Sequence, residues 1–449
     1  MSRIKVILKG FVIVLSSIIL IIVFYLLTGL AQPDTKIDYI LKVDHYTHLV
    51  EVTMTIKPNK RLFLDLFIGE PRSKDRNIRV SNFLVKKKNK EIAHWKSIPT
   101  FSALERVWIG FDNEPITITY TIDPFIERGD RGKAISFLAD DYGYFRGLYI
   151  LYTPITFSEG KSFLFKEVMP KSQPGIASVQ FDLPEGWEVN DPWENMKGIS
   201  IAEFRNTYWG LGKDIEVTHF KDISVGIIEK MDKDAKEILN QNIEKIYREI
   251  EMTTDISIKK NSSFWAISIL PPIPIHGGAA GNYSILMDNN ISIISHEIFH
   301  WWNGSAIETE DEVNWIKEGF TNYYAGKVLF KTGIWSEEDF NAYINTLISE
   351  LDKDYQKPIN LIAASSRLTN GSSSMEDYYQ VYNGGALLAY YIDSELNKDD
   401  KTLDQIWVML YDLDKVITNE DFIDRLQSLS NATFASHVSE MIEGKRVIP

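Results

Sequence analysis

Residues 296–300 read His-Glu-Ile-Phe-His. On a helix, positions i and i+4 share one face, so His296 and His300 can direct two imidazoles at a single point while Glu297 stands beside them. This spacing is typical of a zinc site with a built-in general base. The same pentad also occurs by chance on surface helices, as two solvated histidines beside an acid, so its surroundings must decide between the two interpretations.

The residues around the pentad favour zinc. A largely apolar run at residues 291–294 indicates a buried helix, where unpaired histidines and a glutamate are costly without a metal. An acidic loop at 308–312 leads into a second helical run that contains Glu318. A catalytic zinc uses three protein ligands and leaves a fourth position for water, and Glu318 can supply the third ligand. We therefore predict one Zn²⁺ per chain, held by His296, His300 and Glu318.

These motifs resemble those of a known family. The pentad (HExxH) and the Trp-Ile-Lys-Glu-Gly-Phe segment at 315–320 are similar to motifs of the gluzincin metallopeptidases, specifically the M61 glycyl aminopeptidase family, a relative of the M1 aminopeptidases. Weaker similarities lie at 140–147, 183–187 and 382–388. The resemblance spans most of the chain from residue 37 onward. It implies a β-rich first domain and a thermolysin-like, mostly helical peptidase domain.

The resemblance also implies roles that spacing alone leaves open. Tyr382 matches a tyrosine whose phenol stabilises the oxyanion of the tetrahedral intermediate; on the residues alone, it can equally be a packed aromatic at a helix start. The relatives also have a substrate-binding segment with a glutamate that holds the free amino terminus of the substrate. That segment corresponds here to Gly277, Gly278, Ala279 and Ala280.

Ala280 is the main departure from the family pattern, because it stands where the relatives have that glutamate. Burying a substrate ammonium without a carboxylate partner is costly. Between Asp255 and Glu297 the sequence offers only Asp288, which we expect to cap the start of the zinc helix. The alanine therefore favours an endopeptidase over an aminopeptidase, with acetylated peptides cleaved about as well as free ones. The acids at 308–312 are an alternative anchor for the amine.

The predicted activity is hydrolysis of peptide bonds by a zinc-bound water, with Glu297 as general base and Tyr382 as oxyanion donor. The alternative from another class is a non-catalytic surface binding protein with a structural zinc. The intact Glu297 argues against that alternative, because a structural site needs no base. Members of the family often continue into a PDZ domain, whereas this chain ends at Pro449, so we expect that module to be absent.

The amino terminus predicts export. Three basic residues precede an uncharged, mostly apolar segment that ends at Asp34. A bilayer takes about 20 helical residues, whereas the apolar core of a signal peptide has about 7 to 15. We therefore predict a transmembrane anchor at 1–32 and a single-pass membrane protein whose remaining residues lie outside the cytoplasm. A cleaved signal peptide ending at 29–31 is the alternative.

The composition sets the class of protein. With 449 residues, 44% hydrophobic and 24% charged, the chain is globular and should form more than one domain. A net charge of -14 argues against nucleic acid as a partner, because phosphate binding needs clustered Lys and Arg. Cysteine is absent from the sequence, so no disulfide can form. Asn303 begins one of several Asn-x-Ser/Thr sequences, which we interpret as chance.

The hydrophobic period changes along the chain. Apolar residues alternate with polar ones at 50–56 and 116–122, as in half-buried strands. An apolar stripe with helical spacing follows at 231–250. We therefore predict an α+β protein with a β-sandwich-like domain at 33–226 and a gluzincin catalytic domain at 227–449.

Overall fold

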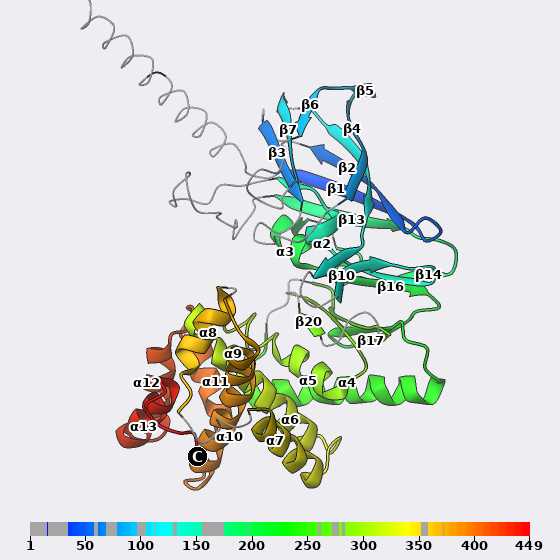
Figure 1. Cartoon of the computed structure of the whole chain (residues 1–449). Helices are drawn as coiled ribbons and strands as arrows, with labels where there is room; N and C mark the ends of the chain where they lie inside the picture. Colours follow the sequence, from blue (N-terminus) through cyan, green and yellow to red (C-terminus); the bar gives the residue numbers. More distant parts are fainter. Residues whose placement is uncertain are drawn as a thin grey trace, which may run out of the picture. The chain divides into compact units, whose positions relative to one another are not determined.

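The computed structural model describes Ser16 and the following ranges: 35–57, 62–68, 79–96, 105–112, 114–128, 133–154, 175–196, 198–258, 262–271, 278–280, 283–351, 358–370 and 372–449. The chain divides into two compact units, 1–216 and 217–449. The first unit consists mainly of strands, and helices predominate in the second (Figure 1). The protein is therefore α+β, as its sequence predicts.

The largest sheet of the first unit has seven strands in the order β15-β13-β1-β2-β8-β4-β5. Its strands are β1 (Lys36–Asp44), β2 (Leu49–Lys57), β4 (Arg79–Lys87), β5 (Lys90–Glu91), β8 (Ile116–Asp123), β13 (Ile176–Asp182) and β15 (Ile199–Ser200). Strands β2 and β8 alternate buried and more exposed residues, which places Val52 opposite Tyr120 and Met54 opposite Ile118. The period of two read from the sequence is thus the period of a sheet with one buried face.

Two smaller sheets complete the first unit. One contains β14 (Trp187–Asn190), β16 (Tyr208–Lys213), β11 (Tyr142–Arg146), β10 (Lys133–Leu138) and β9 (Ile126–Arg128), in that order. The other contains β12 (Thr153–Pro154), β3 (Leu62–Ile68), β7 (Glu105–Asp112) and β6 (His94–Lys96). Two short helices, α2 (Gly147–Ile150) and α3 (Ile201–Asn206), belong to the same unit.

The second unit begins with a five-stranded sheet. Its order is β17 (Glu216–Phe220), β18 (Ile223–Ile227), β19 (Trp265–Ile269), β21 (Ser284–Met287) and β20 (Gly278–Ala280). Strands β18, β19 and β21 are parallel, and their residues are buried, as expected of parallel strands covered on both faces. Strand β20 runs antiparallel to β21 and forms one edge. Helix α4 (Lys233–Thr254), which connects β18 to β19, starts at Asp232, whose side chain accepts a hydrogen bond from Ala235 N.

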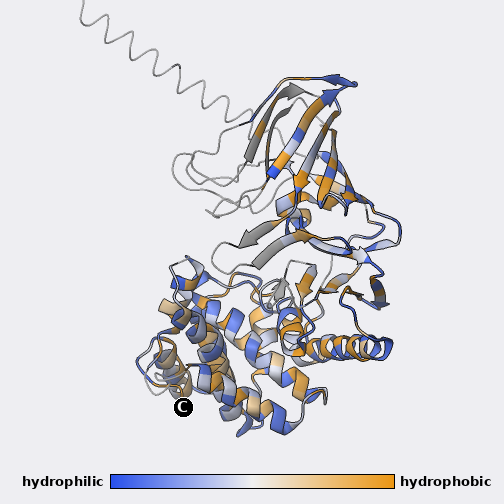
Figure 2. Cartoon of the chain, turned by 45° about the vertical axis from the view of Figure 1, so that its right-hand side comes forward, coloured by the Kyte–Doolittle hydropathy of each residue, from blue (hydrophilic) through white to orange (hydrophobic). Residues whose placement is uncertain are grey.

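The remaining elements are helical. They are α5 (Ile291–Phe299), the 3-10 turn η1 (Asp311–Val313), the π-helix η2 (Trp315–Phe320), α6 (Thr321–Lys331), α7 (Glu337–Leu351), α8 (Leu361–Thr369), α9 (Met375–Tyr379), the π-helix η4 (Gln380–Gly384), α10 (Gly385–Asn397), α11 (Asp404–Tyr411), α12 (Asn419–Leu429) and α13 (Ala432–Ile442). In Figure 2, hydrophobic and hydrophilic residues alternate along these helices, as amphipathic helices require.

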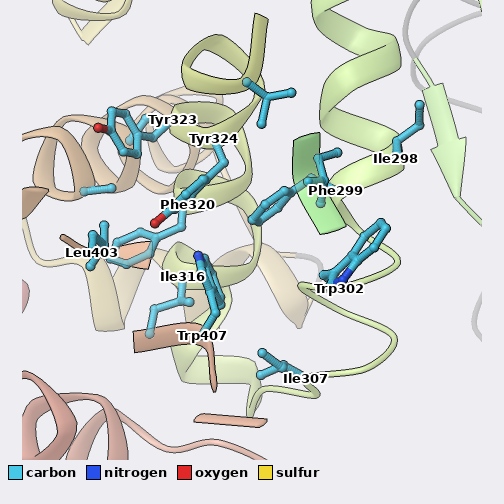
Figure 3. Packing of buried hydrophobic residues seen from close by; sticks show 14 of the residues in the cluster. Ile298, Phe299, Trp302, Ile307, Ile316, Phe320, Tyr323, Tyr324, Leu403 and Trp407 are labelled. Atoms are coloured by element: carbon cyan, nitrogen blue, oxygen red, sulfur yellow. The ribbon is translucent and has the colours of Figure 1, made fainter. Parts of the chain in front are cut away.

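Aromatic rings form the core between the helices. Phe299, the last residue of α5, stacks on Tyr324 of α6 with 4.9 Å between ring centroids, and Trp407 of α11 packs edge-on against both (Figure 3). Phe320 at the end of η2 meets Trp407 with a centroid distance of 6.2 Å. Large buried aromatic contacts of this kind hold their elements in a fixed relation. The core therefore joins α5 to the η2–α6 segment.

The predicted membrane location needs a correction. The proposed anchor at 1–32 lies outside the described residues, apart from Ser16. Within the described part of the chain, no helix combines the length and apolar character that a bilayer crossing requires. The structure therefore does not support the predicted single-pass membrane protein.

Candidate metal centre

Helix α5 is placed by its apolar face. Ile294, Ile298 and Phe299 are fully buried, which leaves the opposite face for the histidines. Ser295 also donates a hydrogen bond from its hydroxyl to the carbonyl of Ala325, at 3.1 Å, and so ties α5 to α6. His300 is the C-cap residue and keeps helical dihedral angles, so the i, i+4 relation to His296 is preserved.

The start of α5 differs from the expectation. Its N-cap is Asn290, whose side-chain oxygen accepts a hydrogen bond from Ser292 N at 3.1 Å. Asp288, which we predicted as the cap, instead accepts from Asn290 N at 3.0 Å in the turn before the helix. Asparagine and aspartate are both good caps, so the sequence alone could not choose between neighbours two residues apart.

Three side chains that can bind a metal converge on one point. The Nε2 atoms of His296 and His300 lie 3.6 Å and 3.3 Å from the same Glu318 oxygen. The two Nε2 atoms are 3.0 Å apart. Tetrahedral ligands at about 2.0 to 2.1 Å from zinc are separated by about 3.3 Å, so these spacings suit zinc. Among the described residues this is the one group of three or more His, Cys, Asp or Glu side chains with such proximity.

The hydrogen bonding of His300 tests whether the cluster fits a metal. Its Nδ1 lies 2.9 Å from the carbonyl oxygen of Asn303, which can only accept a hydrogen bond. A hydrogen therefore lies on Nδ1, and Nε2 is the atom that faces the Glu318 carboxylate and can bind a metal. A cation beside the carboxylate suits this buried site, because imidazole nitrogen and carboxylate oxygen are both ligands that zinc accepts.

Asn303 is a site residue that the sequence did not reveal. Besides orienting His300 through its carbonyl, it donates from Nδ2 to the Ile316 carbonyl at 2.9 Å and to the Thr321 hydroxyl at 3.0 Å. One side chain therefore connects the end of the zinc helix to the segment that carries Glu318. In the sequence Asn303 stood out only as the start of an Asn-x-Ser triplet, and no local pattern indicates a contact 13 or more residues away.

Glu318 is presented by a π-helix that is tightly held. Trp315 at its start donates from its backbone N to the Ser365 hydroxyl at 3.1 Å and from its indole to Asn419 at 2.9 Å. Burial alone would raise the pKa of Glu318, but its interactions with His300 and His296 outweigh that effect and hold the pKa well below its usual value. Glu318 is therefore a carboxylate, the form that binds metal.

Glu297 lies beside the cluster with a different electrostatic balance. Burial raises the pKa of its carboxyl to about 7; His296 opposes this shift and Glu318 adds to it. Only 9% of the residue is exposed. A carboxyl group with a pKa near the working pH can both take up and release a proton, as a general base requires.

Tyr382, on the π-helix η4, also faces the cluster. Its ring lies nearly parallel to that of His296, with 6.1 Å between centroids, and stacks on Tyr378 at 4.2 Å. Burial, together with the nearby Glu318 carboxylate, holds the pKa of the phenol well above its ordinary value. The phenol therefore stays protonated and can donate a hydrogen bond at the cluster.

The predicted substrate segment is described only in part. Gly277 lies outside the described residues. The backbone from Gly278 to Ala280 forms the edge strand β20, in which Gly278 pairs with Met287 and Ala280 with Ile285. Glu308, from the acidic loop that we considered as an alternative amine anchor, lines a pocket beside Trp265 and Tyr411. None of the cluster residues lines that pocket.

Residues 289–396 match the family model of the M61 glycyl aminopeptidases. The matched segment contains the three converging ligands, Glu297 and Tyr382. Over this segment the chain is M61-like. No curated protein sequence matches it.

Solved structures show that the fold of the peptidase is shared. An aminopeptidase N family protein from Idiomarina loihiensis is 17% identical with a TM-score of 0.69, and the match covers 92% of this chain and 77% of that protein. An M1 zinc metallopeptidase from Deinococcus radiodurans is 12% identical with a TM-score of 0.58, covering 93% and 94%. Yeast LTA4 hydrolase is 13% identical with a TM-score of 0.54, covering 93% and 68%.

Proposed function

We propose that the peptidase uses His296, His300 and Glu318 as zinc ligands, Glu297 as general base and Tyr382 as oxyanion donor. The observation that carries this proposal is the meeting of the three ligand atoms at 3.0 to 3.6 Å beside a buried carboxyl group. Pairs of carboxyl groups with oppositely shifted pKa values are typical of catalytic sites. Glu318 and Glu297 form such a pair, because the pKa of Glu318 is held well below its usual value, whereas the pKa of Glu297 is raised to about 7.

The residues divide the chemistry between them. When bound, zinc supplies Lewis-acid polarisation of the scissile carbonyl and lowers the pKa of a water toward about 7. Glu297 takes the proton of the attacking water and passes it to the leaving amine. Tyr382 donates a hydrogen bond from its phenol to the oxyanion that develops on the carbonyl oxygen. His300 is kept in the required tautomer by the Asn303 carbonyl.

We propose peptides as the substrates. We also propose that the helical unit has a thermolysin-like arrangement. The M1 relative from Deinococcus radiodurans has been solved with a Tyr-Ser-Ala substrate, which supports peptides as the substrate class here. Among the described strands, β20 lies at the edge of its sheet and pairs with β21. An edge strand can pair with an extended peptide by β-augmentation, so we propose β20 as the strand that aligns the substrate.

The mode of cleavage has two candidates. Ala280 in β20 favours a peptidase that needs no free amino terminus, because no carboxylate at that position can pair with a substrate ammonium. The names of the family model and of the Idiomarina relative favour an aminopeptidase. We propose the first mode for this chain on the strength of Ala280, and a direct substrate comparison separates the two.

The test uses one peptide in two forms, with a free and with an acetylated amino terminus, and a mass-spectrometric assignment of the cleaved bond. We expect cleavage of both at comparable kcat/KM, loss of activity on chelation, and recovery with added Zn²⁺. Cleavage of the free form alone would establish the aminopeptidase mode. Activity that survives complete removal of metal would contradict the proposed chemistry itself.

A further inference from the structure

The two π-helical segments that carry Glu318 and Tyr382 touch at a pair of glycines. Gly319 follows Glu318 directly in η2, and Gly385 follows the last residue of η4. π-Helical turns are rare and are concentrated at functional sites. Two such turns meet beside the candidate zinc ligands, and their contact explains why both are needed there.

The contact leaves no room for a side chain on either glycine. A Cβ on Gly319 would lie 2.5 Å from Gly385 Cα and 2.7 Å from the Val381 carbonyl oxygen. A Cβ on Gly385 would lie 2.6 Å from the Trp315 carbonyl oxygen and 2.9 Å from Gly319 Cα. All of these neighbours are backbone atoms, which cannot rotate aside as side chains do. Any larger residue must therefore push the two segments apart.

The spacing of the two segments sets the position of the catalytic phenol. Tyr382 lies three residues before Gly385, and its ring lies 6.1 Å, centroid to centroid, from that of the metal ligand His296. Hydrogen bonds hold each segment in place. The backbone N of Trp315 donates to the Ser365 hydroxyl, and the Asn383 side chain donates to Glu350 at 3.0 Å. A displacement at the glycine contact is therefore transmitted to the distance between the phenol and the ligand.

We propose that Gly319 and Gly385 are positioning residues whose Cβ-free contact sets the Tyr382 hydroxyl at its working distance from the metal ligand Glu318. The inference rests on the proposed function, because it assigns a purpose to the placement of Tyr382. Neither glycine touches the reacting atoms. Their effect passes through the separation of η2 and η4.

The chain offers a matched control in the adjacent glycine. Gly384 has helical dihedral angles, and a Cβ placed on it would lie 3.4 Å from Leu361 Cδ2 and farther from its other neighbours, an ordinary van der Waals contact. Gly384→Ala and Gly385→Ala make the same chemical change at neighbouring positions. Both replace glycine by the better helix former. Only the second change intrudes on the contact with η2.

The experiment compares kcat, KM and zinc content of the two variants. Gly384→Ala should keep kcat within about twofold of wild type. Gly385→Ala should lose about 10- to 100-fold in kcat with a smaller change in KM and with zinc retained, since a misplacement of about 1 Å can cost 10²-fold. Equal kcat values for the two variants would overturn the proposal.

A double-mutant cycle tests whether the glycine acts through Tyr382. In a Tyr382→Phe background, Gly385→Ala should cost less than about threefold in further kcat, because the hydroxyl it displaces is already gone. Independent, multiplicative losses would show a merely structural role and overturn the inference. If Gly385→Ala is insoluble, Gly319→Ala enters the same cycle from the other side of the contact. Insolubility of both variants beside a soluble Gly384→Ala would assign the contact to stability alone and also overturn it.

The same cycle keeps this inference distinct from the proposed function. If Tyr382→Phe alone leaves kcat unchanged, the role given to Tyr382 is wrong, and the proposed function fails at that residue. If Tyr382→Phe is strongly impaired while Gly385→Ala is as active as wild type, only the positioning role of the glycines fails.

Discussion

The two units of the protein bury polar groups in different ways. In the first unit, buried phenols donate to backbone carbonyls: Tyr39 to Tyr152 at 2.7 Å and Tyr120 to Ile150 at 2.9 Å. In the second unit, ionisable side chains are buried together, as Glu297, His300 and Glu318 are around the metal centre. Neutral hydrogen-bonded pairs cost little to bury, whereas buried charges need close partners. The buried charge concentrated around Glu297 and Glu318 is typical of a catalytic site.

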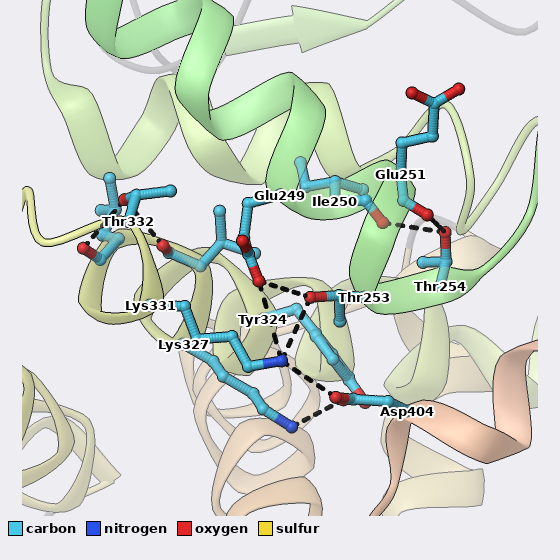
Figure 4. A network of polar contacts seen from close by, with 12 residues as sticks. Glu249, Ile250, Glu251, Thr253, Thr254, Tyr324, Lys327, Lys331, Thr332 and Asp404 are labelled. Atoms are coloured by element: carbon cyan, nitrogen blue, oxygen red, sulfur yellow. Dashed lines mark hydrogen bonds and ion pairs between the residues drawn. The ribbon is translucent and has the colours of Figure 1, made fainter.

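A second group of buried charges in the same unit lies apart from the metal ligands. Lys327 on α6 contacts Asp393 at 2.8 Å and Asp404 at 2.6 Å, and Tyr323 and Tyr324 each donate to one of these carboxylates. Lys331 joins from the same helix through Asp404 and Thr253 (Figure 4). Because α6 continues directly from η2, this network anchors the helix that follows the segment carrying Glu318.

The largest expected effect concerns the catalytic carboxyl group. Glu297→Gln should keep zinc and the fold but lose about 10⁴-fold in kcat, because the amide can no longer accept a proton. Steady-state assays and metal analysis on one preparation provide the measurement. Substantial turnover by this variant would show that the buried Glu297 carboxyl group is not the general base.

A large loss of stability is expected when the anchor network is opened. Lys327→Met removes the cation between two buried carboxylates and should lower the free energy of unfolding by about 3 to 5 kcal/mol. Lys331→Met on the same helix is the matched control. It should cost about 1 kcal/mol or less, because that side chain is 35% exposed and solvent screens its contacts. Equal losses in denaturant titrations would show that burial does not govern these charges.

Removal of one hydroxyl gives a smaller effect at the metal centre. Tyr382→Phe should reduce kcat about 10²- to 10³-fold without loss of zinc, because one oxyanion donor disappears while the ring still stacks on Tyr378. The assay is kcat with the same peptide as for Glu297→Gln. Full activity of the variant would leave the oxyanion without its assigned donor.

A smaller effect on stability is expected from a buried carboxyl group in the first unit. Burial raises the pKa of Asp191 to about 6, although its Oδ1 accepts from the Trp209 indole and from Trp193 N. The folded pKa exceeds the unfolded one, so the folded state binds more protons, and stability falls as pH rises from about 4 through 6. Asp191→Asn can accept the same two hydrogen bonds without charge.

That variant should therefore be more stable than wild type by up to about 3 kcal/mol at pH 7.5, with the difference vanishing below about pH 4. Thermal melts of both proteins across this range provide the measurement, with peptidase activity as the control for an intact second unit. A variant less stable than wild type at pH 7.5 would mean that the charged Asp191 carboxylate stabilises the folded state.

The sequence predicted what depends on local spacing. The pentad gave the relation of His296 to His300, and a family-like segment pointed to Glu318, because helical periodicity fixes which side chains share a face. The alternation at 116–122 likewise predicted a strand with one buried face. These features need no knowledge of the rest of the chain.

What the sequence could not predict depends on contacts between distant segments. Asn303 acts on residues of η2, and Lys327 meets Asp393 and Asp404 more than 60 residues later. The adjacent glycines 384 and 385 offered one usable signal, since glycine inside a helix is unfavourable without a packing reason. Which of the two is in contact with η2 follows only from the fold.

Metal analysis is the direct test that one zinc is held by His296, His300 and Glu318. His300→Ala removes a ligand, whereas His219→Ala makes the same change on strand β17 of the same unit, where the exposed ring packs beside Phe264. We expect about one equivalent of zinc in wild type and in His219→Ala, and almost none in His300→Ala. Undiminished zinc in His300→Ala would contradict the ligand assignment on which the account depends.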